Sequence, residues 1–343
     1  CRYRTAADNA GKGPDESRAQ KYLQECVSAC EALMAKGYSL SPSYKANYNS
    51  ISLASNPEMI FYKPYSQNSL MHSTVDYTVN TSGTSGMTKD AFDAYLFLDG
   101  KPLATTSMDT NDAVEPDAEG HFNIEPILAT RDKRLSIILD PVLAFKGSAY
   151  SRAGVAPFTS STGYGIAKYD NPDELALGDR NNIGKQYTDC PLYWISVVYL
   201  NYAEAKAELG TLTQSDLDKS VNLLMERAGL PGLTTAPEAD PANNMGVSNL
   251  LWEIRRQRRC ELMFDNWTRY WDLVRWHQLE LLDSNKHPNI YKGANLSKLA
   301  NPEVDVAADG YMIGSNTINQ PRAYDKKYYF YPVPSGQITL NPQ

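Results

Sequence analysis

The chain has 343 residues, a formal net charge of −7 at pH 7 and a sequence pI near 5.2. Its length allows a sizeable hydrophobic core, and its acidic balance argues against a nucleic-acid partner, because such proteins usually present a basic face. It contains no apolar run of about 18 residues, so the sequence predicts no membrane-spanning helix.

The first predicted element is an amphipathic helix from Glu16 to Lys36, ended by Gly37. Its apolar stripe at helical spacing consists of Ala19, Tyr22, Leu23, Cys26, Val27, Cys30, Leu33 and Met34. We therefore expect this helix to pack one face against a core.

Residues 38–190 are irregular and rich in Ser, Thr, Asn, Gly and Pro, with short apolar runs at Met59–Tyr62 and Leu135–Leu139. A loop-rich region of this length is uncommon in a compact domain unless it serves binding. The 23 tyrosines of the chain favour recognition, because each ring offers apolar area and a hydroxyl group.

A sugar site needs flat rings that stack on pyranose faces, with polar groups that bind the hydroxyls. Tyrosines lie in two polar stretches of the loop-rich region, close in sequence to amide and guanidinium groups. The candidate ligand-binding residues are Tyr62, Tyr65, Asn68, Tyr77, Arg152, Tyr164 and Tyr169. The alternative interpretation is that each tyrosine fills the core of the loop region.

No catalytic or metal site is predicted from motifs. The zinc-protease, serine-hydrolase and phosphate-loop patterns are absent, and the four histidines are scattered. The acidic segment from Asp109 to Glu119 is a possible calcium site, but Ala113 occupies a ligand position of the EF-hand pattern. A solvated loop is the simpler interpretation, so no cofactor is predicted apart from possible calcium.

Helices are expected again at Leu192–Leu209 and Ser215–Ala228, joined by a short loop as an antiparallel, tetratricopeptide-like pair. A further helical hairpin is expected from Leu250 to Phe264 and from Thr268 to Trp276. Its tryptophans, with Trp194, lie at core-like spacing, which makes them weaker binding candidates than the tyrosines.

This last hairpin carries six arginines: Arg255, Arg256, Arg258, Arg259, Arg269 and Arg275. Phosphate binding is one interpretation. The preferred one is that the long arginine stems cover apolar surface while their heads pair with carboxylates between helices. The five cysteines include no C-x-x-C pair, and we expect buried free thiols.

Several stretches, in order, resemble the SusD/RagB family of surface glycan-binding lipoproteins. They are Arg131–Leu135 (RDKRL), Leu200–Ala205 (LNYAEA), Asn222–Leu230 (NLLMERAGL), Arg258–Leu262 (RRCEL), Arg269–Trp276 (RYWDLVRW), and Tyr331–Pro334 with Asn341-Pro342 near the end. Family members usually carry a long helical region before the part that matches residue 1. The resemblance therefore implies that the N-terminal portion is lacking and that Cys1 is an interior cysteine.

The resemblance implies a mainly α fold, in which tetratricopeptide-like hairpins form a scaffold that carries a long loop-rich insertion. We expect one domain over 1–343, with the scaffold at 16–37 and 192–282, the ligand-facing loops at 38–190, and a C-terminal loop and tail at 283–343. The implied function is non-enzymatic glycan capture at the outer-membrane cell surface and delivery to a SusC-like TonB-dependent transporter. Membrane contact is then made only through a lipid anchor.

Two alternatives remain open at the level of sequence. One is a peptide-binding protein on the same scaffold. The other is a secreted glycoside hydrolase, whose paired carboxylates could be hidden among the 40 acidic residues.

Overall fold

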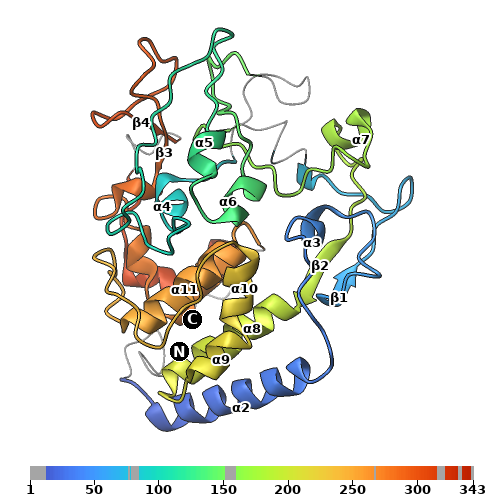
Figure 1. Ribbon diagram of the computed structural model, residues 1–343, viewed down its shortest axis with the longest axis vertical. Helices are drawn as coiled ribbons and strands as arrows, with labels where there is room; N and C mark the ends of the chain where they lie inside the picture. Colours follow the sequence, from blue (N-terminus) through green and yellow to red (C-terminus); the bar gives the residue numbers. More distant parts are fainter. Residues whose placement is uncertain are drawn as a thin grey trace.

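The computed structural model describes residues 13–75, 78, 85–150, 160–265, 268–314, 321–330 and 334–340. Over these residues the fold is mainly α, as predicted, with two small antiparallel sheets (Figure 1). The long helices gather on one side, and the loop-rich segments lie above and beside them.

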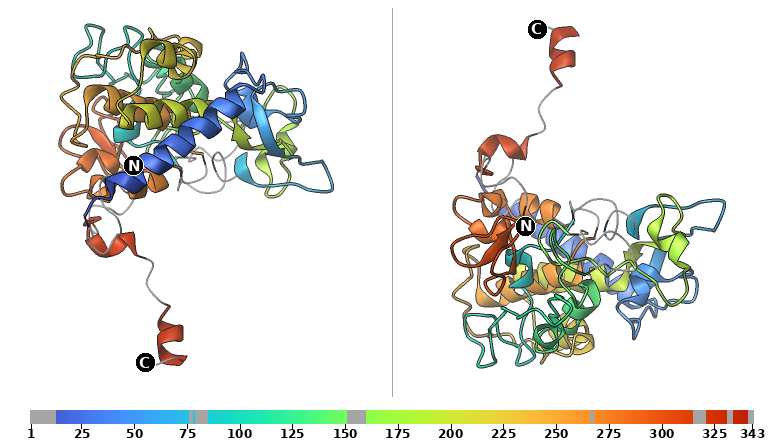
Figure 2. Two further views of the ribbon diagram at one scale, coloured as in Figure 1. Left: turned by 90° about the horizontal axis from the view of Figure 1, so that it is seen from below. Right: turned by 90° about the horizontal axis from the view of Figure 1, so that it is seen from above.

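The scaffold centres on α8 (Ile195–Glu208), which packs against both α2 (Glu16–Met34) and α11 (Asn249–Glu261). Because α8 has neighbours on two sides, even its Tyr202 and Ala203 are fully buried. In contrast, α2 buries only one face and is exposed on the other, as its amphipathic sequence predicts (Figure 2).

Two predicted helices are shorter than expected. Residues Cys190–Trp194 form strand β2, and α8 begins only at Ile195. The expected helix from Ser215 to Ala228 is divided into α9 (Gln214–Asp218) and α10 (Val221–Arg227). The break lies at Ser220, whose hydroxyl donates a hydrogen bond to the Asp216 carbonyl, a local bond that competes with helix continuation.

The described part of the loop-rich region contains strand β1 and only short helices. In chain order they are α3 (Ala46–Asn49), β1 (Met59–Lys63), α4 (Lys89–Phe92), α5 (Glu125–Leu128), α6 (Lys133–Ile138) and α7 (Leu177–Asn181). The apolar run Leu135–Leu139 lies mostly within α6, where Leu135 and Ile138 are buried. Strand β1 pairs antiparallel with β2 and so joins the two ends of the region.

One hydrophobic core extends through both the scaffold and the loop-rich region. It includes Leu200 of α8 and Ile254 of α11 as well as Tyr95 and Leu135 of the loop-rich region. The loops therefore pack onto the helices.

The arginine-rich stretch folds into α11 and α12 (Thr268–Arg275). Arg258 of α11 pairs with Asp272 of α12 at 2.8 Å, which ties the two helices together as predicted, and Arg275 of α12 pairs with the same carboxylate at 2.8 Å. Other arginines of α11 reach carboxylates in more distant segments: Arg255 pairs with Glu208 at 3.0 Å and Arg259 with Asp90 at 2.5 Å.

After α12 the chain forms η3 (Leu279–Leu282), η4 (Pro288–Ile290), β3 (Lys292–Asn295), β4 (Tyr311–Ile313), η6 (Lys326–Tyr329) and α13 (Ser335–Leu340). A small second core lies here, around Trp276 and Leu279. Helix α13 buries none of its side chains and stands away from the rest (Figure 2). No helix in the described ranges is both long and apolar enough to span a membrane.

The described cysteines are all free thiols. Cys30 and Cys260 are buried and Cys26 is partly buried, as predicted, but Cys190 is exposed because it lies on the open side of β2. Trp276 is buried as expected, whereas Trp271 is 49% exposed on α12, so its predicted core position is wrong.

Candidate functional site

An aromatic pocket of about 460 Å³ lies where the β1–β2 sheet, the loop after β1 and the C-terminal end of α11 meet. Its lining includes the aromatic residues Tyr48, Tyr65, His72, Tyr169, Tyr193 and Trp194. A volume in this range is typical of small-molecule sites.

The rings of the aromatic pocket are held at fixed angles to one another. Tyr48 makes edge contacts with Tyr169 and with Trp194, at ring-centroid distances of 6.3 and 6.2 Å. Tyr65 contacts His72 edge-on at 4.7 Å, and the Lys63 ammonium lies 4.8 Å from the centroid of the Tyr65 ring. Such edge contacts stabilise ring orientation, so the rings form a preorganised wall.

Buried polar contacts fix the base of the pocket. The Tyr48 hydroxyl donates to the Asp265 carboxylate at 2.8 Å, and Lys168 pairs with the same carboxylate at 2.6 Å. The Tyr169 hydroxyl donates to the Phe264 carbonyl at 2.8 Å. Burial raises the pKa of Asp265, against the opposing charge of Lys168. These bonds hold Tyr48 and Tyr169 in place, and the Lys168 ammonium also lies over the Tyr48 ring, 3.6 Å from its centroid.

Several polar groups face the same space. The indole Nε1 of Trp194 is buried and has no hydrogen-bond partner among the described residues. The His72 ring contacts the Thr188 carbonyl at 3.0 Å, and burial lowers the pKa of His72. Asp189 and Arg258 also line the pocket. Rings with nearby donors and acceptors suit a polyhydroxylated ligand.

The structure brings two of the predicted residues, Tyr65 and Tyr169, to this pocket. Tyr62 is half-buried on β1 and packs against the core. Asn68 is exposed in a tight turn with φ of 62°, outside the pocket lining. Tyr77 and Arg152 lie outside the described residues.

Tyr164 requires a correction. Its side chain is only 2% exposed, and its ring stacks on Phe92 with centroids 4.8 Å apart. Both ring faces are therefore within the core, so Tyr164 has no face for a ligand in this structure. For this residue the alternative interpretation, that the ring fills the core, describes its position.

The sequence interpretation missed the most accessible rings. Tyr193 is 65% exposed and Phe61 is 56% exposed, and the two stack across the β1–β2 sheet at 6.4 Å. The sequence predicts a helix from Leu192 onwards with Trp194 at core-like spacing; Trp194 is buried, but Tyr193 lies on strand β2 and faces solvent. Pro191, which precedes them, was the available signal, because the residue before a proline and the proline itself favour extended backbone.

The predicted calcium segment folds as hydrogen-bonded turns. Asp109 accepts the Asn111 amide at 2.9 Å, Asp117 accepts the His121 amide at 2.8 Å, and Asp112 binds Asn295 and Tyr311. Across the described ranges, no group of three or more His, Cys, Asp or Glu side chains is placed to hold a metal ion.

The sequence stretches that resemble a known family meet in a buried ion-pair network. Arg134 binds Asp132 at 2.6 Å and Glu261 at 2.9 Å, and Arg227 binds Glu261 at 2.5 Å and Glu58 at 2.7 Å. Apart from Glu58, these residues belong to the RDKRL, ERAGL and RRCEL stretches. A second junction joins Glu204 of YAEA to Arg275 at 2.6 Å.

The family model of the SusD family matches residues 31–343. The chain belongs to this family. In this chain, the stretches that resemble the family supply cations and anions that join the helices to the loops. None of the curated proteins matches the chain in sequence.

Solved structures of SusD-like proteins share this fold. A SusD-like carbohydrate-binding protein from Bacteroides fragilis is 21% identical with a TM-score of 0.65, over 94% of this chain and 61% of its own. Another SusD-like protein from the same species is 20% identical with a TM-score of 0.60, over the same shares. A SusD superfamily protein from Parabacteroides distasonis is 19% identical with a TM-score of 0.51, over 94% and 56%. The chain thus spans less than two thirds of these relatives.

Proposed function

We propose that this protein captures oligosaccharide at the bacterial cell surface without cleaving it, and that the aromatic pocket is part of its binding site. The observation that carries the proposal is the group of rings at this pocket, Tyr65, Tyr169, Tyr193 and Trp194, beside polar groups that suit sugar hydroxyls. The similar structure described as a carbohydrate-binding protein supports the same ligand class.

The proposal includes the finer steps expected of a SusD-like lipoprotein: a lipid anchor in the outer membrane and delivery of the glycan to a SusC-like TonB-dependent transporter. In such a role, binding must be reversible, so affinity comes from ring stacking and hydroxyl hydrogen bonds and release is passive. The exposed Phe61–Tyr193 pair extends the ring surface beyond the pocket, as suits a chain ligand.

The test is affinity electrophoresis in gels that contain plant, fungal, host or bacterial polysaccharides. We expect retardation by at least one polysaccharide, weakened about fivefold by Tyr193→Ala or Tyr65→Ala, since one stacked ring contributes roughly 1 kcal/mol. Tyr22→Ala is the matched control, because Tyr22 is exposed on α2 outside the pocket. Retardation that survives both pocket variants would place the site elsewhere.

A parallel incubation of the protein with the retarding polysaccharide tests for cleavage. We expect no new reducing ends. Release of shorter sugars would favour a glycoside hydrolase, whereas failure of every polysaccharide to bind, together with binding of peptides, would favour the peptide-binding alternative.

A further inference from the structure

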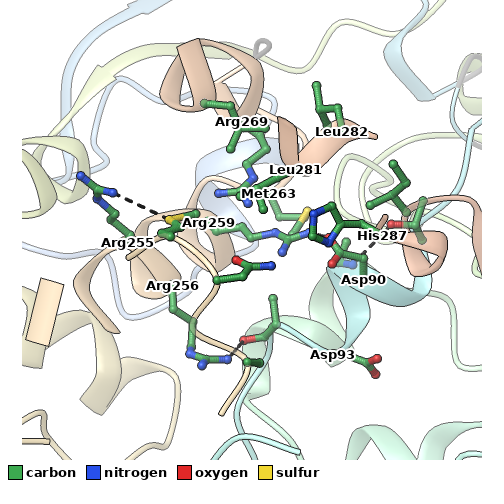
Figure 3. A pocket seen from close by; sticks show the side chains of 18 of the residues that line it. Asp90, Asp93, Arg255, Arg256, Arg259, Met263, Arg269, Leu281, Leu282 and His287 are labelled. Carbon is green, nitrogen blue, oxygen red and sulfur yellow. Dashed lines mark hydrogen bonds and ion pairs between the residues drawn. The ribbon is translucent and has the colours of Figure 1, made fainter. Parts of the chain in front are cut away.

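A separate cavity of about 370 Å³ lies between α4, α11, α12 and the segments η3 and η4 (Figure 3). It shares no lining residue with the aromatic pocket. We call it the arginine cavity, because its wall contains Arg255, Arg256, Arg259, Arg269 and Arg322, with His287.

The carboxylates that line the arginine cavity are already neutralised. Asp90 binds Arg259 at 2.5 Å, and Asp93 binds Lys89 at 2.7 Å. Two of the arginines are likewise paired, Arg255 with Glu208 and Arg256 with both Asp240 and Glu253. These pairs leave Arg269 without a carboxylate partner among the described residues of the cavity.

Arg269 is the central uncompensated cation. It forms no hydrogen bond or ion pair with the residues that the structure describes, and its closest ring contact is Trp276, at 5.9 Å from the guanidinium carbon to the ring centroid. In Figure 3 its guanidinium points towards Arg259, and that of Arg259 lies beside the His287 ring. Burial and the charge of Arg259 lower the pKa of Arg269, against the opposing effect of Asp90.

Hydrogen-bond donors are available at the same place. The Nε of Arg259 is buried and lacks a partner among the described residues, so this guanidinium uses only part of its donor capacity on Asp90. An arginine that leaves its donors unsatisfied in a buried position is costly. An oxyanion placed between Arg259 and Arg269 would satisfy these donors and reduce the repulsion between the two cations.

The lining of the cavity also includes apolar side chains. They are those of Met245, Met263, Leu273, Leu281, Leu282 and Ile290. A ligand that fills the cavity therefore needs both an anionic head and an apolar body, and the cavity volume is within the range of small-molecule sites.

We propose that the arginine cavity binds a small organic anion, with its oxyanion head between Arg259 and Arg269 and its apolar body against Leu281 and Leu282. This site is additional to the proposed glycan pocket and does not depend on it. The same head group occurs on free carboxylates and phosphates and on the acidic sugars of polysaccharides, so the experiment distinguishes these sources.

The test is isothermal titration calorimetry of the full chain with phenyl phosphate, benzoate, inorganic phosphate and neutral benzamide. We expect phenyl phosphate and benzoate to bind at one site, inorganic phosphate to bind more weakly, and benzamide not to bind. Arg269→Met should weaken phenyl phosphate binding about tenfold or more, since a hydrogen bond to a charged group is worth roughly 1.5–3 kcal/mol. Arg18→Met, an exposed position on α2, removes the same charge elsewhere and should leave binding unchanged.

Oligogalacturonate forms the second arm, because its carboxylates are carried on sugar rings. If Arg269→Met abolishes oligogalacturonate binding and Tyr193→Ala leaves it unchanged, the anion bound in the cavity is an acidic glycan. If only the small anions bind, the anion bound in the cavity is a free metabolite. Binding of benzamide as strong as that of benzoate, or phenyl phosphate affinity unchanged by Arg269→Met, overturns the proposal.

Two further measurements separate binding from folding. We expect Arg269→Met to keep or raise the Tm, because it removes a cation without an ion pair and keeps an apolar stem. A lower Tm would contradict the conclusion that the Arg269 guanidinium has no ion pair. Leu282→Trp narrows the cavity beside its apolar side chains and leaves every charge in place. It should abolish phenyl phosphate binding while inorganic phosphate still binds.

Discussion

Charged side chains carry much of the specificity of this fold at the scale of single residues. Glu261 is fully buried, and its two oxygens bind Arg134 and Arg227 at 2.9 and 2.5 Å. The cations lower the pKa of Glu261 although burial by itself would raise it. A buried pair of this kind costs more to break than it contributes when intact, because the remaining charge is left without a partner.

We therefore expect Glu261→Gln to lower the free energy of unfolding by about 3–5 kcal/mol, measured by urea denaturation. The matched control is Glu25→Gln, which removes an exposed pair with Lys21 at 4.0 Å and should change stability by less than about 1 kcal/mol. A similar small effect at both positions would show that the network contributes little to stability.

The lowered pKa of Glu204 predicts how the free energy of unfolding depends on pH. Burial raises its pKa, but the charges and hydrogen bonds of Arg275, Arg258 and Arg255 outweigh burial and lower it from 4.5 to about 2. A carboxylate whose pKa is lower in the folded state stabilises the fold above the unfolded pKa and loses that contribution as pH falls. We expect the free energy of unfolding to decrease between pH 4.5 and 2. In Glu204→Gln this decrease should be smaller, and an unchanged slope in urea titrations would contradict the assignment.

At the scale of elements, local chemistry decides where the scaffold helices begin and end. Thr213 starts α9 with a capping box: its hydroxyl accepts the Asp216 amide at 3.2 Å, and the Asp216 carboxylate accepts the Thr213 amide at 3.0 Å. The Asp216 carboxylate also pairs with Lys206 at 2.7 Å, which fixes α9 against α8.

Thr213→Ala should therefore lower the free energy of unfolding by about 1 kcal/mol, the usual effect of losing an N-cap side chain. Thr211→Ala is the control, since Thr211 is exposed in the same loop. Thermal or urea denaturation of the two variants checks this, and equal stabilities would indicate that the cap is replaced by water.

The pairing of β1 with β2 determines which aromatic rings of the two strands are accessible to solvent. The pairing places Phe61 opposite Tyr193, and both are exposed while the half-buried Tyr62 packs on the core. Alternation along a strand explains why neighbours in sequence face opposite sides. The ring to mutate on β1 is therefore Phe61, although the sequence favoured Tyr62.

At the scale of the whole molecule, the C-terminal end of α11 is the point where loops and helices join. Lys168 binds Asp265 at 2.6 Å, the Tyr44 hydroxyl binds the Glu261 carbonyl at 2.7 Å, and the Tyr95 hydroxyl binds the Cys260 carbonyl at 3.0 Å. These contacts and the common core argue that residues 38–190 and 192–282 unfold together as one domain.

Hydrogen exchange measured by mass spectrometry in increasing urea tests this cooperativity. We expect peptides from 38–190 and from 192–282 to lose slow-exchange protection at the same urea concentration. Earlier loss in the loop-rich peptides would show that the loops form a separate, less stable unit.

The sequence by itself determined the mainly α scaffold, the hairpin of α11 and α12, and the pairing role of their arginines. These features depend on helical periodicity and on charge, which short segments carry. The stretches around Arg134, Arg227 and Glu261 also carried the resemblance to the family. These three side chains form buried ion pairs that join helices and loops.

Only the tertiary structure decided which tyrosines face solvent. Tyr65 and Tyr164 occur in similar polar stretches, yet Tyr65 lines the pocket and Tyr164 stacks on Phe92 in the core. Tertiary structure likewise decided the partners of the arginines: the other α11 and α12 arginines pair with carboxylates, whereas Arg269 has no such pair among the described residues. Burial and partner choice depend on segments far apart in the chain, and no local pattern encodes them.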